Sequence, residues 1–190
     1  HACRWYRIHL ERGGSPVSLA VNVSKAGLFQ NDFVDFYTDI KDKYSVPDGV
    51  LELEFTESML AADTELFAEL VVNLNARGFI CSLDDFGSGY SSLNLLKNLP
   101  IDVLKLDILF FHKSRDIRRE RIVVSNVINM ARELNIKTIA EGVEDMDTVE
   151  FLRKAGCNVI QGYVFAKPMP QEDFEHLLME NQDGPFGSGD

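Results

Sequence analysis

Short runs of apolar residues with polar ends recur along the chain, and each is followed by a longer stretch whose apolar positions have helical spacing. Alternation with a period of two predicts a β-strand, whereas apolar positions three or four residues apart predict an amphipathic helix. On this pattern we expect six strands, at Val17–Asn22, Val50–Thr56, Phe79–Asp84, Asp102–Asp107, Lys137–Glu141 and Asn158–Gln161. The helices between them include Ala61–Arg77, Arg118–Leu134 and Thr148–Ala155. Strands that alternate with helices of this length are typical of a parallel sheet built from βαβ units.

Residues that start or stop a helix stand at the expected helix ends. Gly78, Asn135 and Gly156 each follow a helical stretch just before a strand, where a left-handed residue often ends a helix. Asp147 precedes Thr148–Ala155, and we expect its carboxylate to cap that helix.

The length of 190 residues suits a single domain. We expect this domain to span residues 1–181 and a Gly-rich, flexible tail to occupy residues 182–190. A complete (β/α)₈ barrel has eight strands in about 250 residues. Six strands therefore predict either an open sheet or an α/β fold of the TIM-like (β/α) barrel type that lacks roughly its first two strands. The polar residues at the strand ends favour the barrel.

Polar side chains stand near the C-terminal end of each expected strand. They are Asn22, Glu54, Asp84, Lys105, Glu141 and Gln161. Active sites of (β/α) barrels are built at this end of the strands. Carboxylates that are buried together need a bound cation or protonation, and oxygen ligands without His or Cys suit Mg²⁺, Mn²⁺ or Ca²⁺. The adjacent Asp84 and Asp85 could bridge two ions, an arrangement that recurs in phosphodiester hydrolysis.

Each of these residues, taken alone, also has an ordinary structural explanation. A single Glu in an alternating strand is usually solvated, and an Asp-Asp pair often marks a turn or a helix cap. Their occurrence at successive strand ends is what indicates a site. The segment Asp85–Ser92, with its Gly-Ser-Gly sequence, is either a simple βα turn or a mobile loop whose backbone amides lie over a phosphate.

A formal net charge of −11 argues against a surface for a nucleic-acid polymer, which would need clustered Lys and Arg. The three cysteines lack metal-binding spacing, so we expect free thiols in a reducing compartment, with Cys81 in the core. No run reaches the roughly 18 apolar residues that span a bilayer, and the first residues do not resemble a signal peptide. We therefore expect a cytoplasmic domain without direct membrane contact. A membrane anchor elsewhere in a longer parent protein stays open.

Several short motifs, in this order, resemble those of the EAL domain family, the bacterial cyclic-di-GMP phosphodiesterases. The matching segments are Asn22–Ser24, Leu53–Glu57, Leu83–Ser92, Leu99–Pro100, Lys105–Asp107, Ala140–Glu144, Gln161–Tyr163 and Lys167–Pro168. The resemblance implies that the protein binds cyclic-di-GMP. It also implies that Mg²⁺ or Mn²⁺ supports hydrolysis of one phosphodiester to give linear pGpG.

The resemblance further implies roles for individual residues. The positions that correspond to ligands of two metal ions are Asn22, Glu54, Asp84, Asp85 and Glu141. Lys105 corresponds to a lysine beside the attacking water and the scissile phosphate, and Glu144 and Gln161 correspond to residues that support that water. Glu57 corresponds to a glutamate that anchors the segment Asp85–Ser92.

The Glu-Ala-Leu sequence that names the family does not occur in the chain. In the family this glutamate is a metal ligand on an earlier strand, which agrees with the two strands that the count leaves missing. We therefore expect part of a larger multidomain signalling protein or a naturally shortened relative, and a homodimer is possible because EAL domains often pair. Two other interpretations stay open. One is a catalytically inactive module that binds cyclic-di-GMP, and the other is an enolase-like barrel with carboxylate-bound Mg²⁺ and Lys105 as a base.

Overall fold

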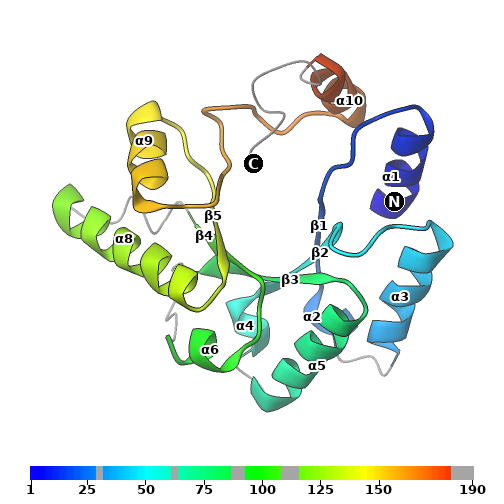
Figure 1. Cartoon of the computed structure of the whole chain (residues 1–190), viewed down its shortest axis with the longest axis horizontal. Helices are drawn as coiled ribbons and strands as arrows, with labels where there is room; N and C mark the ends of the chain where they lie inside the picture. Colours follow the sequence, from blue (N-terminus) through cyan, green and yellow to red (C-terminus); the bar gives the residue numbers. More distant parts are fainter. Residues whose placement is uncertain (29–31, 61–63, 87–92, 108–115, 181–190) are drawn as a thin grey trace.

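A parallel sheet of six strands, curled into part of a barrel, organises the chain in the computed structural model (Figure 1). The structure describes residues 1–28, 32–60, 64–86, 93–107 and 116–180. The strands are β1 Leu19–Asn22, β2 Leu51–Thr56, β3 Ile80–Phe86, β4 Val103–Leu106, β5 Lys137–Ala140 and β6 Val159–Ile160. They pair in parallel in the order β1-β2-β3-β4-β5-β6, so each strand lies beside its neighbours in the sequence.

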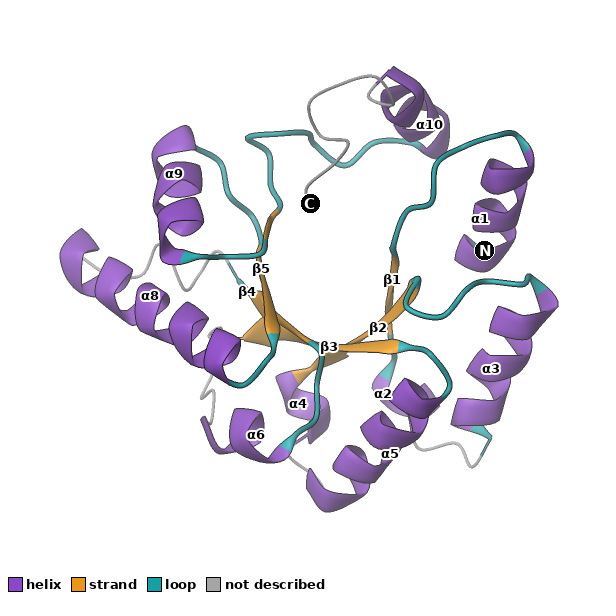
Figure 2. Cartoon of the chain, viewed as in Figure 1, coloured by secondary structure: helices purple, strands orange, loops and turns teal. Residues whose placement is uncertain are grey.

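Helices connect the strands and lie around the outside of the curled sheet (Figure 2). They are α1 Ala2–Glu11, α2 Lys25–Leu28, α3 Phe33–Lys43, α4 Glu57–Leu60, α5 Thr64–Ala76, α6 Leu93–Asn98, α8 Ile117–Glu133, α9 Met146–Ala155 and α10 Gln171–Glu180. Parallel strands that are sequential neighbours and are joined by helices have the connectivity of a (β/α) barrel. All six strands predicted from the sequence pattern are present.

Strand β2 shows how the alternating pattern is used. Leu51, Leu53 and Phe55 belong to the hydrophobic core, and the ring of Phe55 meets the ring of Phe67 on α5 edge to face, with 5.0 Å between centroids. Glu52, Glu54 and Thr56 alternate with them and face the inside of the barrel, and the two glutamates are buried as well. A strand that is covered on both faces is expected in a parallel sheet whose outer face carries helices.

Left-handed residues end three helices at the positions that the sequence indicated. Gly78, Asn135 and Gly156 have φ angles of 79°, 59° and 85°. Glycine adopts this conformation without a steric penalty, and asparagine tolerates it better than most residues do. Each of these residues lets the chain leave a helix and turn directly into the next strand.

The expected cap of α9 was wrong. The N-cap is Asp145, and Asp147 lies in the first turn of the helix. One oxygen of Asp145 accepts a hydrogen bond from the Thr148 backbone N–H at 2.8 Å, and the other accepts one from the Thr148 hydroxyl at 2.8 Å. The helix therefore begins two residues earlier than its apolar spacing indicated, because the side chain that accepts from the amides of the first turn is that of Asp145.

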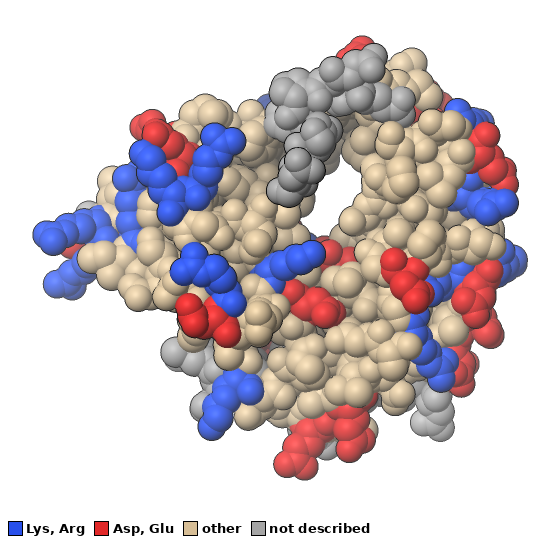
Figure 3. All heavy atoms as spheres, viewed as in Figure 1, with Lys and Arg blue, Asp and Glu red and all other residues tan. Residues whose placement is uncertain are grey.

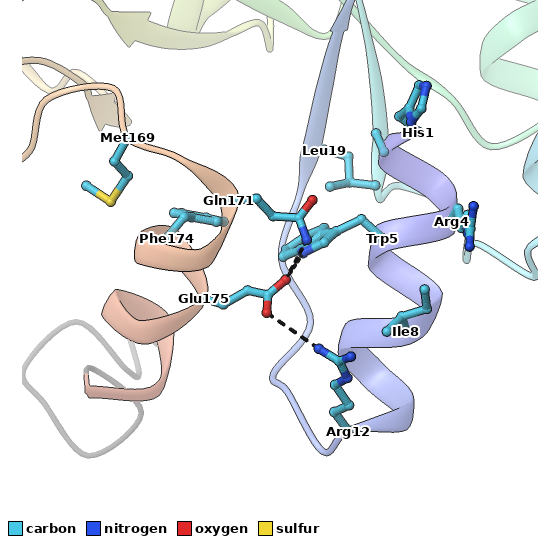
Figure 4. A pocket seen from close by; sticks show the side chains of 11 residues that line it. His1, Arg4, Trp5, Ile8, Arg12, Leu19, Met169, Gln171, Phe174 and Glu175 are labelled. Atoms are coloured by element: carbon cyan, nitrogen blue, oxygen red, sulfur yellow. Dashed lines mark hydrogen bonds and ion pairs between the residues drawn. The ribbon is translucent and has the colours of Figure 1, made fainter.

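The outer strands of the sheet, β1 and β6, leave an opening in the barrel wall, and helices α1 and α10 meet across it (Figure 4). The indole of Trp5 donates a hydrogen bond to Glu175 Oε1 at 2.6 Å, and its ring lies 5.9 Å from that of Phe174. Arg12 lies 3.6 Å from the same glutamate. A cavity of about 620 Å³ lies between the two helices. Side chains, rather than a β-ladder, thus join the two ends of the open sheet.

No helix in the described residues is long and apolar enough to cross a membrane. The three cysteines are unpaired, as expected. Cys81 is fully buried in the core, and burial raises the pKa of its thiol, so it remains a neutral packing residue.

The cap of α9 gives a first testable prediction. Asp145→Ala should lower the free energy of unfolding by about 1 kcal/mol, because it leaves the Thr148 amide without its acceptor. Urea denaturation measures this loss. The control is Asp147→Ala, which removes only a charge from the first turn and should cost about 0.5 kcal/mol or less. A larger loss in the control than in Asp145→Ala would contradict the assignment of the cap.

Candidate active site

A cavity of about 470 Å³ lies inside the curled sheet, toward the C-terminal ends of the strands. Its lining residues are Ser18, Ala20, Asn22, Glu52, Glu54, Asp84, Lys105, Ile139, Glu141 and Gln161. Six of the site residues predicted from the sequence are among them, one from or next to each strand. Seen from one face, the molecule is hollowed near its centre, and acidic and basic side chains lie side by side at the rim (Figure 3).

Strand register is what brings these residues to one level. Asn22 on β1 is paired with Glu54 on β2, and the neighbouring Val23 N–H donates to the Glu54 carbonyl at 3.0 Å. At the other side of the site, the Glu141 N–H donates to the Leu106 carbonyl at 2.9 Å, which continues the β4–β5 ladder beyond its last pair. Parallel strands end at a common edge, so residues far apart in the sequence meet there.

The ammonium of Lys105 lies at the point where three of the carboxylates converge. Its Nζ is 2.8 Å from an oxygen of Glu141 and 3.7 Å from one of Asp84, and it also donates a hydrogen bond to Glu54. Lys105 and Glu54 are both buried, whereas Asp84 and Glu141 are partly exposed. The Lys105 ammonium thus offsets the negative charge of three carboxylates, which come from three different strands or strand ends.

The pKa values of this cluster follow from burial and charge. Burial lowers the pKa of the Lys105 ammonium, but hydrogen bonds to Glu141 and Glu54, and their charges, outweigh it and raise that pKa. Burial raises the pKa of Glu141, and the opposing effect of Lys105 is smaller. Lys105 is therefore positively charged at neutral pH, and Glu141 retains its charge less readily than an exposed glutamate does.

Asp84 and Asp85 lie in an irregular part of β3. The pairing with β4 shifts register between Leu83 and Phe86, and Asp85 has a φ of 58°. The Asp85 N–H donates to its neighbour's carboxylate, Asp84 Oδ1, at 2.9 Å. A bulge of this kind changes the direction of a side chain at the edge of a site. Asp85 therefore belongs to the strand itself, although its sequence position indicated the start of a loop.

Neighbouring carboxylates affect the pKa of Asp85 more strongly than the Lys105 ammonium does. Its pKa is raised, first by burial, then by the charges of Asp84 and Asp107 and by a hydrogen bond with Asp107, while Lys105 opposes these effects. Asp107 was not among the predicted site residues, although it interacts with Asp85. It directly follows β4 and comes two residues after Lys105, so the alternation of side chains could have indicated that both lie on the same side.

Gln161 is held by a backbone crossing between two loops. The Val143 N–H donates to the Gln161 carbonyl at 3.1 Å, and the Val143 carbonyl accepts from the Val164 N–H at 3.1 Å. The crossing is so close that a Cβ on Gly162 would lie 2.1 Å from the Val143 carbonyl oxygen. Only glycine fits there, and the crossing sets the position of Gln161 relative to Glu141.

Three predicted residues, Asp85, Glu57 and Glu144, are not part of the lining of this cavity. Glu57 begins α4 directly after β2, and Glu144 is exposed in the loop between β5 and α9. The segment Asp85–Ser92 lies mostly outside the described residues, so the predicted contact of Glu57 with it stays a prediction. The predicted supporting role of Glu144 likewise stays a prediction.

The donor chemistry of the cavity fits a hard divalent cation, because its ligands would be carboxylate and amide oxygens. Among the described residues, however, no three Asp, Glu, His or Cys side chains are arranged so that they could hold a metal ion. The carboxylates of Glu54, Asp84 and Glu141 instead form ion pairs with the Lys105 ammonium. The residues suit a divalent ion by their chemistry, and an ion would compete with Lys105 for the same oxygens.

Known proteins are similar to this chain in fold and in sequence. Residues 1–168 match the EAL domain family. The bifunctional diguanylate cyclase/cyclic di-GMP phosphodiesterase MucR of Pseudomonas aeruginosa is 37% identical over 171 residues, which are 90% of this chain and 25% of MucR. The crystal structure of the EAL domain of Mycobacterium smegmatis DcpA superposes with a TM-score of 0.87 at 32% identity, over 94% of this chain and 81% of that one. The PaMucR phosphodiesterase in complex with c-di-GMP superposes with a TM-score of 0.82 at 37% identity, over 91% of this chain and 70% of that one.

The fold and the acid-lined cavity define a partial (β/α) barrel with a polar site at the C-terminal strand ends, which confirms the predicted fold class. The chain belongs to the EAL domain family. It spans about a quarter of the length of the curated relatives YkoW of Bacillus subtilis and MucR, at 22% and 25%.

The loop crossing gives a second prediction. Gly162→Ala should destabilise the fold by about 1–3 kcal/mol, because the added Cβ must push the Val143 backbone away. Chemical denaturation measures the loss. Gly27→Ala is the matched control, since its Cβ would meet only the Ser24 hydroxyl, at 3.2 Å. A Gly162→Ala protein as stable as the control would show that the two loops are not tightly held.

The raised pKa of Asp85 gives a third prediction. In the folded state the ionised carboxylate is unfavourable, so Asp85→Asn should raise stability at pH 7. Asparagine tolerates the left-handed φ about as well as aspartate does. The gain should vanish as the pH falls below the ordinary aspartate pKa, where the wild-type carboxyl is protonated in both states. Thermal melts at pH 7 and at low pH compare the two proteins, and an equal gain at both would contradict a charge effect.

Proposed function

We propose that this chain carries the site for metal-dependent hydrolysis of cyclic-di-GMP to linear pGpG. The observation that carries the proposal is the convergence of Glu54, Asp84 and Glu141 on Lys105 in one cavity at the strand ends. Membership of the EAL domain family and the similarity to a phosphodiesterase solved with c-di-GMP support the choice of substrate.

In the proposed reaction a water oxygen bonds to one phosphorus of the ring. The bond from that phosphorus to a ribose 3′ oxygen breaks, and the leaving oxygen takes up a proton. The Lys105 ammonium would lie against the phosphoryl oxygens and stabilise the negative charge that develops there. Its raised pKa keeps it charged for this task. Gln161 and Glu144 would orient the water from the loops after β6 and β5.

Asn22, Glu54, Asp84, Asp85 and Glu141 would hold Mg²⁺ or Mn²⁺, in a site for two ions. When bound there, the ions would supply a Lewis acid that lowers the pKa of a bound water and offsets the phosphate charge. Glu57 would anchor the segment Asp85–Ser92 at the edge of the site. In the family a further glutamate ligand comes from the Glu-Ala-Leu strand, which this chain does not contain.

The position of Lys105 among Glu54, Asp84 and Glu141 favours a second candidate function, because no three acidic side chains in the described residues are arranged to hold an ion. This candidate is a module that binds cyclic-di-GMP without cleaving it. The same cavity and the same Lys105 would bind the anionic ring, and regulation of a partner domain would replace turnover. Both candidates place the chain within a larger signalling protein in the cytoplasm. A homodimer is expected from the family alone.

Glu54→Gln separates these candidates and gives the fourth prediction. The purified chain is incubated with cyclic-di-GMP and Mn²⁺, and pGpG is measured by chromatography while nucleotide binding is measured by calorimetry. The variant should form pGpG about 100-fold more slowly or worse, because an amide is a poorer metal ligand than a carboxylate and carries no charge to offset the ion. Glu133→Gln, an exposed change at the end of α8, is the control and should match the wild type.

Turnover by Glu54→Gln at the wild-type rate would refute the assignment of this ligand. Tight binding of cyclic-di-GMP by the wild-type chain with no pGpG would favour the binding module. Neither binding nor turnover would exclude both functions for this chain.

A further inference from the structure

A buried glutamate with an unpaired oxygen lies next to the proposed metal ligands. Glu52 is on β2, two residues before Glu54, and faces the inside of the barrel as Glu54 does. Its side chain is 9% exposed. Among the described side chains, Glu52 Oε1 is one of two buried polar atoms without a hydrogen-bond partner. None of the proposed catalytic roles uses this residue.

An unpaired buried carboxylate oxygen is costly, so its retention needs a physical reason. Burial raises the pKa of Glu52 first of all, and a hydrogen bond with Ser82 and the positive charge of Lys105 act in the opposite direction. Glu52 and Lys105 line the same cavity of about 470 Å³, and Glu52 also lines a second cavity of about 450 Å³ toward the N-terminal ends of the strands.

The proposed metal site creates a conflict for Lys105. Its ammonium is gathered with Glu54, Asp84 and Glu141, which are three of the proposed metal ligands. A divalent ion on those oxygens would repel an ammonium that stayed among them, because like charges a few ångströms apart repel one another. Lys105 must therefore give up at least part of these contacts when ions bind. Its long, flexible side chain permits such a movement.

We propose that Glu52 is the second partner of Lys105, which receives the ammonium when divalent ions occupy Glu54, Asp84 and Glu141. The unpaired Oε1 of Glu52 is the acceptor. Glu52 is then a positioning residue, because it acts on the reaction only through Lys105. It lies deeper in the barrel than Glu54 does, so the ammonium stays in the site without occupying the ligand oxygens. This inference rests on the proposed metal-dependent function.

The test is the affinity of the whole chain for Mn²⁺, measured by calorimetry without nucleotide. Glu52→Gln keeps the shape and the acceptor for Ser82 but removes the charge that attracts Lys105. The ammonium should then stay on the metal ligands, and Mn²⁺ affinity should fall about tenfold, within the range of couplings between contacting groups. Glu69→Gln on the outer surface of α5 is the matched control and should leave the affinity unchanged.

The same substitution in a Lys105→Met background separates positioning from a direct effect of charge on the ions. Without the ammonium, Glu52→Gln should change Mn²⁺ affinity by less than about twofold, because nothing remains to be relocated. An equal loss in both backgrounds would overturn the proposal, as would an unchanged affinity in Glu52→Gln. Absence of Mn²⁺ binding by the wild type would overturn it together with the metal-dependent function, which distinguishes the two failures.

A measurement on the unmodified chain covers the case in which a variant fails to fold. The ¹⁵Nζ resonance of Lys105, identified by its loss in Lys105→Met, should shift when Mg²⁺ saturates the site, because the ammonium changes its acceptor. A resonance that stays in place at saturating Mg²⁺ would overturn the proposal without any substitution at Glu52.

Discussion

Electrostatic balance at the C-terminal end of the sheet is the constraint on which the site depends. The carboxylates of Glu54, Asp84 and Glu141 would repel one another at this distance, and the buried ammonium of Lys105 offsets their charge. The chain as a whole has a net charge of −11, so the positive charge of Lys105 is opposite in sign to the net charge of the protein. The proposed catalysis and metal binding would both depend on this balance.

Backbone geometry then fixes where the charges can go. Parallel register places Asn22 beside Glu54, a bulge turns Asp85 within β3, and the crossing at Gly162 holds the loop that carries Gln161. The register and the crossing are held by backbone hydrogen bonds and close packing, whereas the Asp84 carboxylate itself accepts a hydrogen bond from the Asp85 N–H at the bulge.

The opening between β1 and β6 separates this chain from a complete barrel. The side chains of α1 and α10 join the ends of the sheet through Trp5, Phe174 and Glu175. A site with residues on six strands remains together because each strand is paired with its sequence neighbour, so the opening interrupts the wall without scattering the residues.

Alternation of polar and apolar residues was enough to predict all six strands, their parallel order and six of the residues around the cavity, because side-chain direction in a strand follows directly from sequence position. Local signals also identified the helix stops at Gly78, Asn135 and Gly156. The cap at Asp145, the inclusion of Asp85 in β3 and the contact of Asp107 with Asp85 were decided only by the fold. The same holds for the gathering of three carboxylates on Lys105 and for the unpaired oxygen of Glu52. Those features depend on distances between strands far apart in the sequence and on how deeply each side chain is buried, and neither quantity is encoded by local periodicity.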